Sequence, residues 1–370
     1  MRKVLFIFGT RPEAIKLARV VHYLRDQTDI EPIICATAQH REMLDQVMKL
    51  FKLEAQFDLD IMSPGQTLSA STGRIITRLE PVMTQVKPDA VLVQGDTTTT
   101  FCGALAAFYA NIPVGHVEAG LRTGDIRQPF PEEMNRLMVS RLAALHFAAT
   151  ERARDNLLVE NVTPATIQVT GNTGIDAVLH IRDQLEAGKL TARSWDFLGD
   201  SKKLLLVTAH RRESFGPGFE RLCQALGKIA ERSDVRIVYP VHLNPNVRAP
   251  VQKYLAGHPN IVLLEPLDYL DFVDLMRRAY ILLTDSGGIQ EEAPSFGKPV
   301  LVMREKTERP EAVEAGTSTL VGTDIKRIVD AANELLDDER EYSRRALIHN
   351  PYGDGRASAR IAAALGDYLG

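Results

Sequence analysis

The sequence predicts an α/β protein built from two similar halves, each a parallel sheet with helices on both faces. Short apolar strands alternate with amphipathic helices in both halves of the chain. The alternation pauses around residues 170–173, and the polar residues 184–200 follow as the expected linker. With 370 residues and 45% hydrophobic content, the chain can bury one core in each half. We therefore expect two Rossmann-like domains that face a central cleft.

In the first half, the expected strands and helices follow one another at short intervals. The chain enters a strand at residues 3–8, and the helix 14–24 follows with apolar residues at helical spacing. The remaining expected elements are the strands 32–37, 90–94 and 112–117 and the helices 39–44, 47–51, 71–86 and 101–110. Ligands of parallel sheets bind outside the carboxyl ends of the strands. Arg11, Asp96 and Glu118 all follow expected strands, so we expect them at such an edge.

The second half repeats this alternation. Its expected strands are residues 203–208, 236–241, 261–264, 279–283 and 299–303. The last turn, residues 350–355, precedes a helix that carries Ile361, Leu365 and Leu369 on one apolar stripe.

One turn of the second half has the features of an anion site. The strand 279–283 breaks at an Asp-Ser-Gly-Gly turn, residues 285–288, and a helix follows. A glycine-rich helix start leaves N–H groups uncovered, and these donors favour an anion together with the helix dipole. Glu292, one turn further on, could accept hydrogen bonds from sugar hydroxyl groups. The alternative is an Asp or Ser N-cap in a ligand-free turn, which this stretch taken alone slightly favours.

A second turn of this kind opens the chain. Residues 9–16 follow the first strand, and Pro12 suits the first turn of a helix. Arg11 and Lys16 bring positive charge to the end of that strand, which suits a diphosphate better than a core. The alternative is a solvated helix start whose long side chains lie along the surface.

Composition excludes several classes of protein. The net charge of −4 and the lack of a basic run argue against a nucleic-acid surface. Cys35, Cys102 and Cys223 show no metal-ligand spacing, and we expect them to be reduced, buried thiols of a cytosolic protein. No apolar run approaches membrane length and no signal peptide precedes the first strand. We therefore expect a cytoplasmic protein without a membrane partner or a metal.

Acidic residues at strand ends are the remaining candidates for chemistry. The glycine patterns of NAD and P-loop sites, the Gly-x-Ser-x-Gly turn and the zinc motifs are all missing from the sequence, so we expect no cofactor. Asp96 could act in catalysis or equally cap the next helix. Glu118 has no obvious capping role, and Glu132 could be a first-turn helix acid. His210, flanked by two arginines, could bind an anion as an imidazolium or act as an acid near neutral pH.

These stretches resemble the signatures of the non-hydrolysing UDP-N-acetylglucosamine 2-epimerase family. They occur in order over nearly the whole chain: FGTRPEAIK at 8–16, GDTTT at 95–99, HVEAGLR at 116–122, HRRE at 210–213, DSGGIQEE at 285–292, TERPE at 307–311 and NPYGDG at 350–355. The resemblance implies the GT-B fold, with a C-terminal helix that crosses back to the first domain. It implies a sugar-binding domain at 1–172 joined by 356–370, and a UDP-binding domain at 173–355.

The resemblance also implies roles for individual residues. The catalytic residues would be Asp96, Glu118, Glu132 and His210. The substrate-binding residues would be Arg11, Lys16, Leu267, Phe272, Ser286, Gly287, Gly288, Glu292 and Arg309. A second pocket for UDP-GlcNAc as an effector would involve Gln39, His40, Glu133 and His242. Small departures occur at Gln94, where His is common in the family, and in the loop 127–131.

The implied reaction inverts C2 of UDP-GlcNAc to give UDP-ManNAc. UDP is eliminated to leave 2-acetamidoglucal and then added back, which requires carboxylates as base and acid and cations at the leaving diphosphate. The product would supply ManNAc-type sugars for cell-surface polysaccharide, and the enzyme would be a homodimer. The alternatives are a hydrolysing epimerase that releases ManNAc and UDP, a GT-B glycosyltransferase, or a non-catalytic sugar-nucleotide sensor.

Overall fold

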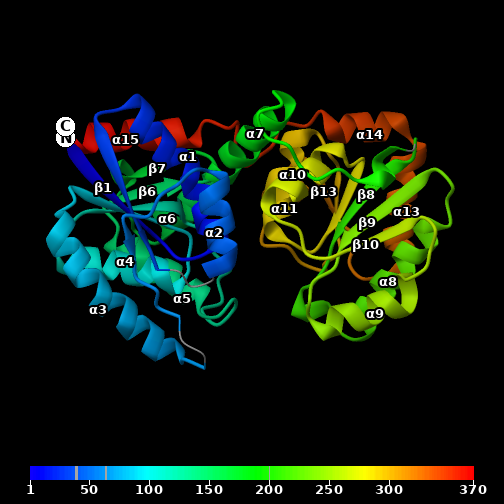
Figure 1. The fold of residues 1–370 in the computed structure, drawn as a ribbon, viewed down its shortest axis with the longest axis horizontal. Helices are drawn as coiled ribbons and strands as arrows, with labels where there is room; N and C mark the ends of the chain where they lie inside the picture. The colour runs from blue at the N-terminus through cyan, green and yellow to red at the C-terminus, as the bar shows by residue number, and fades with distance from the viewer. Residues whose placement is uncertain (38–40, 63–64, 200) are drawn as a thin grey trace. The chain divides into compact units, whose positions relative to one another are not determined.

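The computed structural model describes residues 1–37, 41–62, 65–199 and 201–370, which form two compact units (Figure 1). The first unit consists of Met1–Ala177 and Tyr352–Gly370, and the second consists of Val178–Pro351. Each unit contains one sheet in which the strands pair in parallel. The predicted α/β fold with two parallel sheets is confirmed. The boundary between the units falls within helix α7 (Thr173–Glu186).

The first unit is built on a seven-stranded sheet in the order β3-β2-β1-β4-β5-β6-β7. Its strands are β1 (Arg2–Phe8), β2 (Ile30–Ala36), β3 (Phe57–Asp58), β4 (Ala90–Gln94), β5 (Val114–Ala119), β6 (Leu145–Ala148) and β7 (Ile167–Val169). The chain starts in the middle with β1, moves to one edge and returns beside β1 with β4. The strand order therefore reverses between β1 and β4, and such a switch point is where open α/β sheets bind ligands.

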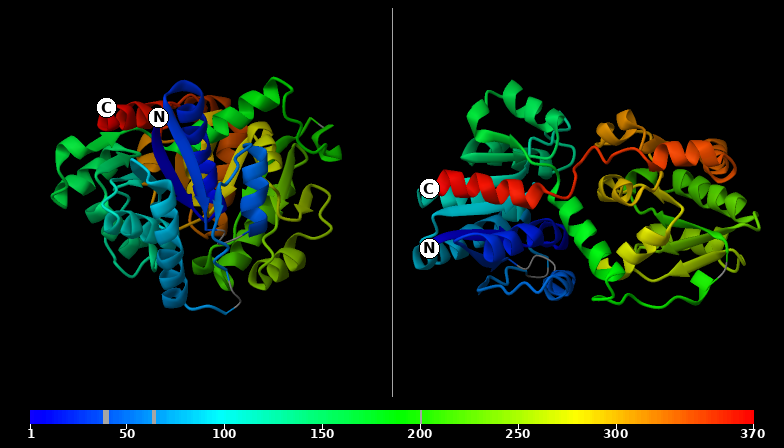
Figure 2. Two further views of the ribbon diagram at one scale, coloured as in Figure 1. Left: turned by 60° about the vertical axis from the view of Figure 1, so that its left-hand side comes forward. Right: turned by 90° about the horizontal axis from the view of Figure 1, so that it is seen from above.

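Helices cover both faces of this sheet (Figure 2). They are α1 (Arg11–Gln27), α2 (Arg41–Leu50), α3 (Leu68–Val86), α4 (Thr98–Tyr109), α5 (Glu132–Leu142), α6 (Glu151–Val159) and α15 (Ala357–Leu369). Leu5 and Ile7 alternate along β1 and belong to a core shared with residues of α3 and α4. Because the core holds each strand end in place, the loops that follow β1, β4 and β5 have fixed starting points.

The second unit repeats the plan with a six-stranded sheet in the order β10-β9-β8-β11-β12-β13. Its strands are β8 (Lys203–Thr208), β9 (Val235–Pro240), β10 (Ile261–Leu264), β11 (Ile281–Thr284), β12 (Val300–Val302) and β13 (Ser318–Leu320). Here the order reverses between β8 and β11. Its helices are α8 (Pro217–Ala230), α9 (Pro245–Leu255), α10 (Tyr269–Arg278), α11 (Gly287–Glu292), α12 (Pro310–Ala315), α13 (Ile325–Asp337) and α14 (Glu339–Ala346).

Four short strands were missing from the sequence prediction. They are β3, β6, β7 and β13, which have two to four residues each. Runs of this length show no periodicity, and these four lack the pronounced apolar run of the predicted short strands, so their pairing with neighbouring strands identifies them. The expected linker 184–200 is also partly wrong. Its first residues belong to α7, and Trp195 is only 8% exposed, with the Arg193 guanidinium 4.6 Å from its ring centroid.

The C-terminal helix returns to the first unit, as predicted. In α15, Ile361 and Leu365 are fully buried, and the helix packs against α1. Both ends of the chain lie at the same side of this unit (Figure 1). At the start of the helix, Asp176 accepts hydrogen bonds from the backbone N–H groups of Ala357 (3.1 Å) and Ser358 (2.7 Å). This carboxylate therefore satisfies two N–H groups at the start of the helix.

Two further expectations concern the chain as a whole. Cys35, Cys102 and Cys223 are free and buried, as predicted, and burial raises the pKa of each thiol to about 12. In the described ranges, the structure contains no helix with the length and apolar character that a membrane span requires.

Replacing Asp176 should weaken the attachment of α15. In Asp176→Asn an amide NH2 faces one of the two N–H donors, so one buried donor loses its acceptor. We expect the free energy of unfolding to fall by about 1–3 kcal/mol, measured by urea denaturation. Asp367→Asn is the control, because Asp367 is exposed on the same helix. Equal stability of the two variants would contradict the role given to Asp176.

Candidate functional site

A buried carboxylate joins the two loops at the switch point of the first unit. Glu13 is 1% exposed and accepts hydrogen bonds from the N–H of Thr10 (2.8 Å) and from the hydroxyl of Thr97 (2.7 Å). The N–H of Gly9 and the hydroxyl of Thr100 also donate to it, each at 3.1 Å. Burial raises the pKa of Glu13, and these hydrogen bonds oppose the rise. Glu13 thereby fixes the loop after β1 against the loop after β4.

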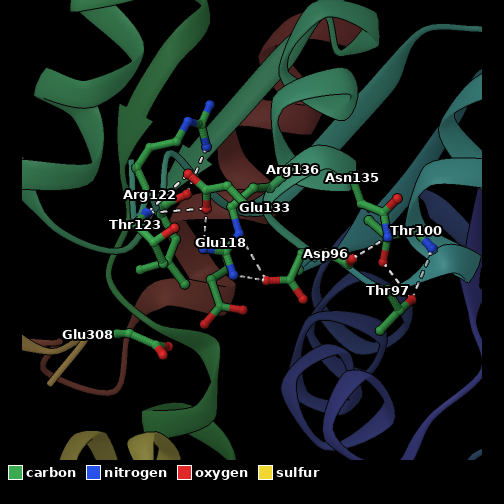
Figure 3. Close-up of polar contacts among 12 residues, drawn as sticks. Asp96, Thr97, Thr100, Glu118, Arg122, Thr123, Glu133, Asn135, Arg136 and Glu308 are labelled. Carbon is green, nitrogen blue, oxygen red and sulfur yellow. Dashed lines mark hydrogen bonds and ion pairs between the residues drawn. The ribbon is translucent and has the colours of Figure 1, made fainter. Parts of the chain in front are cut away.

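Asp96 lies in the loop after β4 and is not a helix cap. Thr97 takes that role, since its hydroxyl accepts from the N–H of Thr100 at 3.1 Å. Asp96 instead pairs with Arg136 of α5, whose Nε lies 3.1 Å from Oδ2 (Figure 3). The side chain of Asn135 donates to the Asp96 carbonyl at 2.8 Å. Asp96 is therefore held by a second helix, and its side chain retains 24% of its exposure.

Glu118, the penultimate residue of β5, has an uncommon backbone conformation. Its φ is 67°, in the left-handed region, and the pairing of β5 with β6 shifts register between Val117 and Ala119. Residues other than glycine rarely adopt this conformation, and they concentrate at functional sites. The carboxylate accepts from Lys16 Nζ at 2.5 Å and from Gln94 Nε2 at 2.6 Å. Gln94 thus contacts the candidate acid directly.

The other predicted residues of the first unit have different surroundings. Arg11 begins α1, and Glu132 begins α5; both are half-buried. Glu133 is 1% exposed and accepts from the N–H groups of Thr123 and Gly124, at 3.1 Å each. Arg136 also donates to Glu133, at 2.9 Å. The Glu133 carboxylate is therefore committed to contacts within the unit. The predicted effector residues Gln39 and His40 lie outside the described residues.

In the second unit, the predicted anion turn lies at the carboxyl end of β11. Ser286 is at the N-cap position of α11, and its side chain makes no capping hydrogen bond. A Cβ on Gly287 would lie 3.7 Å from Cζ of Arg309, so the guanidinium packs directly on the glycine backbone. Arg309 also forms an ion pair with Glu291. The Ser286 side chain thus does not cap α11, and the backbone N–H of Ser286 donates to Oγ1 of Thr284 at 2.9 Å.

Asp285 joins the anion turn to the loop after β8. It is fully buried, and its Oδ2 accepts from the N–H groups of His210 (2.6 Å) and Arg211 (2.7 Å). The ring of His242 stacks on that of His210, with the centroids 5.2 Å apart and the planes at 13°. Burial lowers the pKa of His210, and His242 and Arg211 act in the same direction, whereas Asp285 opposes them. Burial, His242 and Arg211 therefore disfavour the imidazolium, which is one of the two roles that the sequence left open for His210.

The predicted nucleotide contacts lie in the same unit. Leu267, Phe272 and Glu292 are each half-buried. Leu267 precedes Asp268, whose carboxylate caps α10 by accepting from the N–H of Asp271 at 2.8 Å. This cap fixes the start of the helix that carries Phe272. Among the described residues, no group of three or more His, Cys, Asp or Glu could hold a metal ion.

Comparison with known proteins agrees with the resemblance seen in the sequence. A family model described as UDP-N-acetylglucosamine 2-epimerase matches residues 22–366. The chain belongs to this family. A UDP-N-acetylglucosamine 2-epimerase of Escherichia coli K12 is 58% identical over 98% of both chains.

Solved structures of this family show the same fold. The UDP-GlcNAc 2-epimerase of Neisseria meningitidis bound to UDP-GlcNAc is 49% identical, with a TM-score of 0.91, over 99% of this chain and 100% of that one. The Methanocaldococcus jannaschii enzyme in complex with UDP-GlcNAc and UDP is 34% identical, with a TM-score of 0.81, over 99% of each chain. These family members match the present chain over both of its units.

Several residues that hold the site were not among the predicted site residues: Glu13, Gln94, Arg136 and Asp285. Each is buried and acts on a predicted residue or its loop. Glu13 and Asp285 lie within two of the sequence stretches that resemble the epimerase family. This resemblance was the one feature of the sequence that indicated a role for them. Their hydrogen-bond partners come from distant parts of the chain and cannot be read from local spacing.

We expect Glu13→Gln to destabilise the first unit and to slow any reaction at its switch point. The new NH2 group would face donors of Thr10 or Thr97, leaving at least one of them without an acceptor. The free energy of unfolding should fall by about 1–3 kcal/mol in urea denaturation. Glu80→Gln on the exposed face of α3 is the matched control. Wild-type stability in Glu13→Gln would show that the carboxylate is not needed to join the loops.

Proposed function

We propose that the chain catalyses the reversible, non-hydrolysing epimerisation of UDP-GlcNAc to UDP-ManNAc. The observation that carries this proposal is the pair of carboxylates at strand ends of the first sheet, Asp96 and Glu118, each hydrogen-bonded to a cation from another element. Membership of the epimerase family supports the choice of substrate. The N. meningitidis structure bound to UDP-GlcNAc supports it as well.

The reaction begins with the loss of the C2 proton and of UDP. A carboxylate takes the proton, the C1–O bond to the diphosphate breaks with its electron pair, and a C1–C2 double bond forms in 2-acetamidoglucal. Glu118, Asp96 and Glu132 are the proposed proton-transfer groups. The glucal is then protonated at C2 on the opposite face, and the β-phosphate oxygen of UDP bonds again to C1.

The leaving diphosphate needs positive charge and N–H donors. We assign this role in the second unit to Ser286, Gly287 and Gly288, to Arg309, and to His210. Fixed donors that face the developing charge stabilise the transition state more than the ground state. Glu292 would accept from the ribose hydroxyls, and the segment 267–272 would contact the uracil. Arg11 and Lys16 of the first unit would add positive charge.

Further features follow from the family resemblance and belong to the same proposal. The protein would act in the cytoplasm as a homodimer, and its product would supply ManNAc-type sugars for cell-surface polysaccharide. A second UDP-GlcNAc would act as an effector, with His242, Gln39 and His40 among its contacts. The buried Glu133 would support such a pocket only through the loop that it holds.

Loss of a nucleotide contact should weaken binding of UDP itself. Glu292→Ala and Arg309→Ala each remove a charge-assisted contact, so we expect about 1.5–3 kcal/mol, roughly tenfold or more in Kd. Isothermal titration calorimetry with UDP measures the change. Arg327→Ala, an exposed arginine on α13, is the control. Wild-type affinity in both variants would mean that the turn after β11 has only a structural role.

The products formed from UDP-GlcNAc alone, in D2O, test the reaction. Proton NMR should show UDP-ManNAc with deuterium at C2, because the proton returns from an exchangeable carboxylic acid. Oxygen label at the C1 bridge should scramble into the β-phosphate of UDP, because the C1–O bond breaks. Asp96→Asn, Glu118→Gln and Glu132→Gln should each reduce kcat by orders of magnitude with milder loss of UDP binding.

Other outcomes of this experiment would select another function. Free ManNAc with UDP would indicate a hydrolysing epimerase, and no turnover without an acceptor would indicate a glycosyltransferase. Deuterium at C2 without label scrambling would contradict elimination. Near-normal kcat in all three carboxylate variants would contradict the assignment of these residues.

A further inference from the structure

Asp285 has one carboxylate oxygen that its surroundings leave unsatisfied. Oδ2 accepts two short hydrogen bonds from the backbone of the loop after β8, but Oδ1 is buried and has no hydrogen-bond partner among the described residues. The side chain is fully buried. A buried carboxylate oxygen without a donor destabilises the folded protein, because the oxygen loses its hydration and gains no hydrogen-bond partner. Its persistence at a loop beside the anion turn therefore points to a function.

The imidazole of His210 lies close to this oxygen. Nδ1 of His210 lies 3.7 Å from Oδ1, which is too long for a hydrogen bond but within reach of a small rotation of the ring. The His210 side chain is 43% exposed, so the ring has room to turn. Catalytic hydrogen bonds are often long in the free enzyme and shorten when the substrate binds.

We propose that Asp285 is the positioning residue for His210. When a diphosphate binds, Nδ1–H of His210 donates to Oδ1 of Asp285, and Nε2–H of the imidazolium donates to a phosphate oxygen. This inference rests on the proposed function, in which His210 contacts the diphosphate of UDP. Asp285 itself does not contact the diphosphate in this proposal, and Nε2 of His210 is the nitrogen that faces the phosphate.

The charged and titratable groups around His210 come from three elements. Arg211 follows it in the loop after β8, His242 stacks on it from the loop after β9, and Asp285 lies at the end of β11. Tyr239 of β9 lies nearby and donates its hydroxyl to the Ala209 carbonyl at 2.7 Å. Burial raises the pKa of Tyr239 well above its usual value, so this tyrosine remains uncharged.

These surroundings determine how His210 responds to a ligand. Burial, His242 and Arg211 lower the pKa of His210. Among these groups, Asp285 alone raises it. A diphosphate adds negative charge on the other side of the ring and tips the balance toward the imidazolium. Binding of UDP should therefore take up a proton from solution at about neutral pH, since the free protein favours the neutral ring.

Calorimetry of UDP binding in two buffers with different ionisation enthalpies measures this uptake. At pH 7.5 we expect wild-type protein to take up a substantial fraction of one proton per UDP bound. Asp285→Asn and His210→Asn should each lose most of that uptake. An asparagine that replaces a histidine-orienting aspartate presents an NH2 group and selects the wrong tautomer, even where the geometry is retained.

Asp176→Asn provides the matched control. Asp176 is also a buried aspartate that accepts from two consecutive backbone N–H groups, but it lies in the first unit at the start of α15. It should lose stability while its proton uptake matches that of the wild type. Equal uptake in the wild type and in Asp285→Asn would overturn the proposal.

Turnover gives a second, independent readout. If Asp285 acts through His210, kcat should fall by about tenfold or more in Asp285→Asn, and adding this change to His210→Asn should cause little further loss. The alkaline limb of the kcat profile should move to lower pH by roughly one unit or more, because loss of the carboxylate lowers the pKa of the imidazolium. Multiplicative losses in the double variant would contradict the proposal.

Two remaining outcomes are also decisive. Should Asp285→Asn fail to fold, 15N NMR of His210 in wild-type protein with UDP answers the question. A protonated Nδ1 supports the proposal, and an unprotonated Nδ1 overturns it. A wild-type protein that binds UDP with this proton uptake but does not form UDP-ManNAc would contradict the proposed function and leave the Asp285–His210 pair standing.

Discussion

In each unit, a buried carboxylate ties together the two loops at the point where the strand order reverses. Glu13 does so between β1 and β4, and Asp285 does so between β8 and β11. A buried carboxylate needs hydrogen-bond donors, and Glu13 takes them from both of its loops. Asp285 follows β11 and takes its donors from the backbone of the loop after β8. The site residues depend on this constraint, because they lie in or directly beside these loops.

The candidate acids of the first unit depend on cations from other elements. Arg136 of α5 reaches Asp96, and Lys16 of α1 reaches Glu118. Such pairs hold each carboxylate in a fixed orientation. The left-handed backbone at Glu118 adds a strained element that the surrounding sheet maintains.

In the second unit, an N-cap without a side-chain hydrogen bond, the Arg309 guanidinium and the His210 ring come from segments far apart in the sequence. Two buried carboxylates lie among them: Glu291, which pairs with Arg309, and Asp285. Asp285 holds the His210 loop through one oxygen and leaves the other oxygen aimed at the imidazole. The Asp285 side chain thus fixes the loop after β8 and also lies beside the His210 ring, which is the titratable group of that loop.

The sequence by itself determined the fold class, the family and the residue types of the site, because strand–helix alternation and the spaced glycines and charges are local properties. It left open whether Asp96 caps the next helix; the structure places Thr97 at the cap and Arg136 on the Asp96 carboxylate. Short strands such as β6 and β13 also required their neighbours. The partners of Glu13 and Asp285 were beyond sequence reasoning, since hydrogen bonds between loops some 75–87 residues apart exist only once the strands are paired.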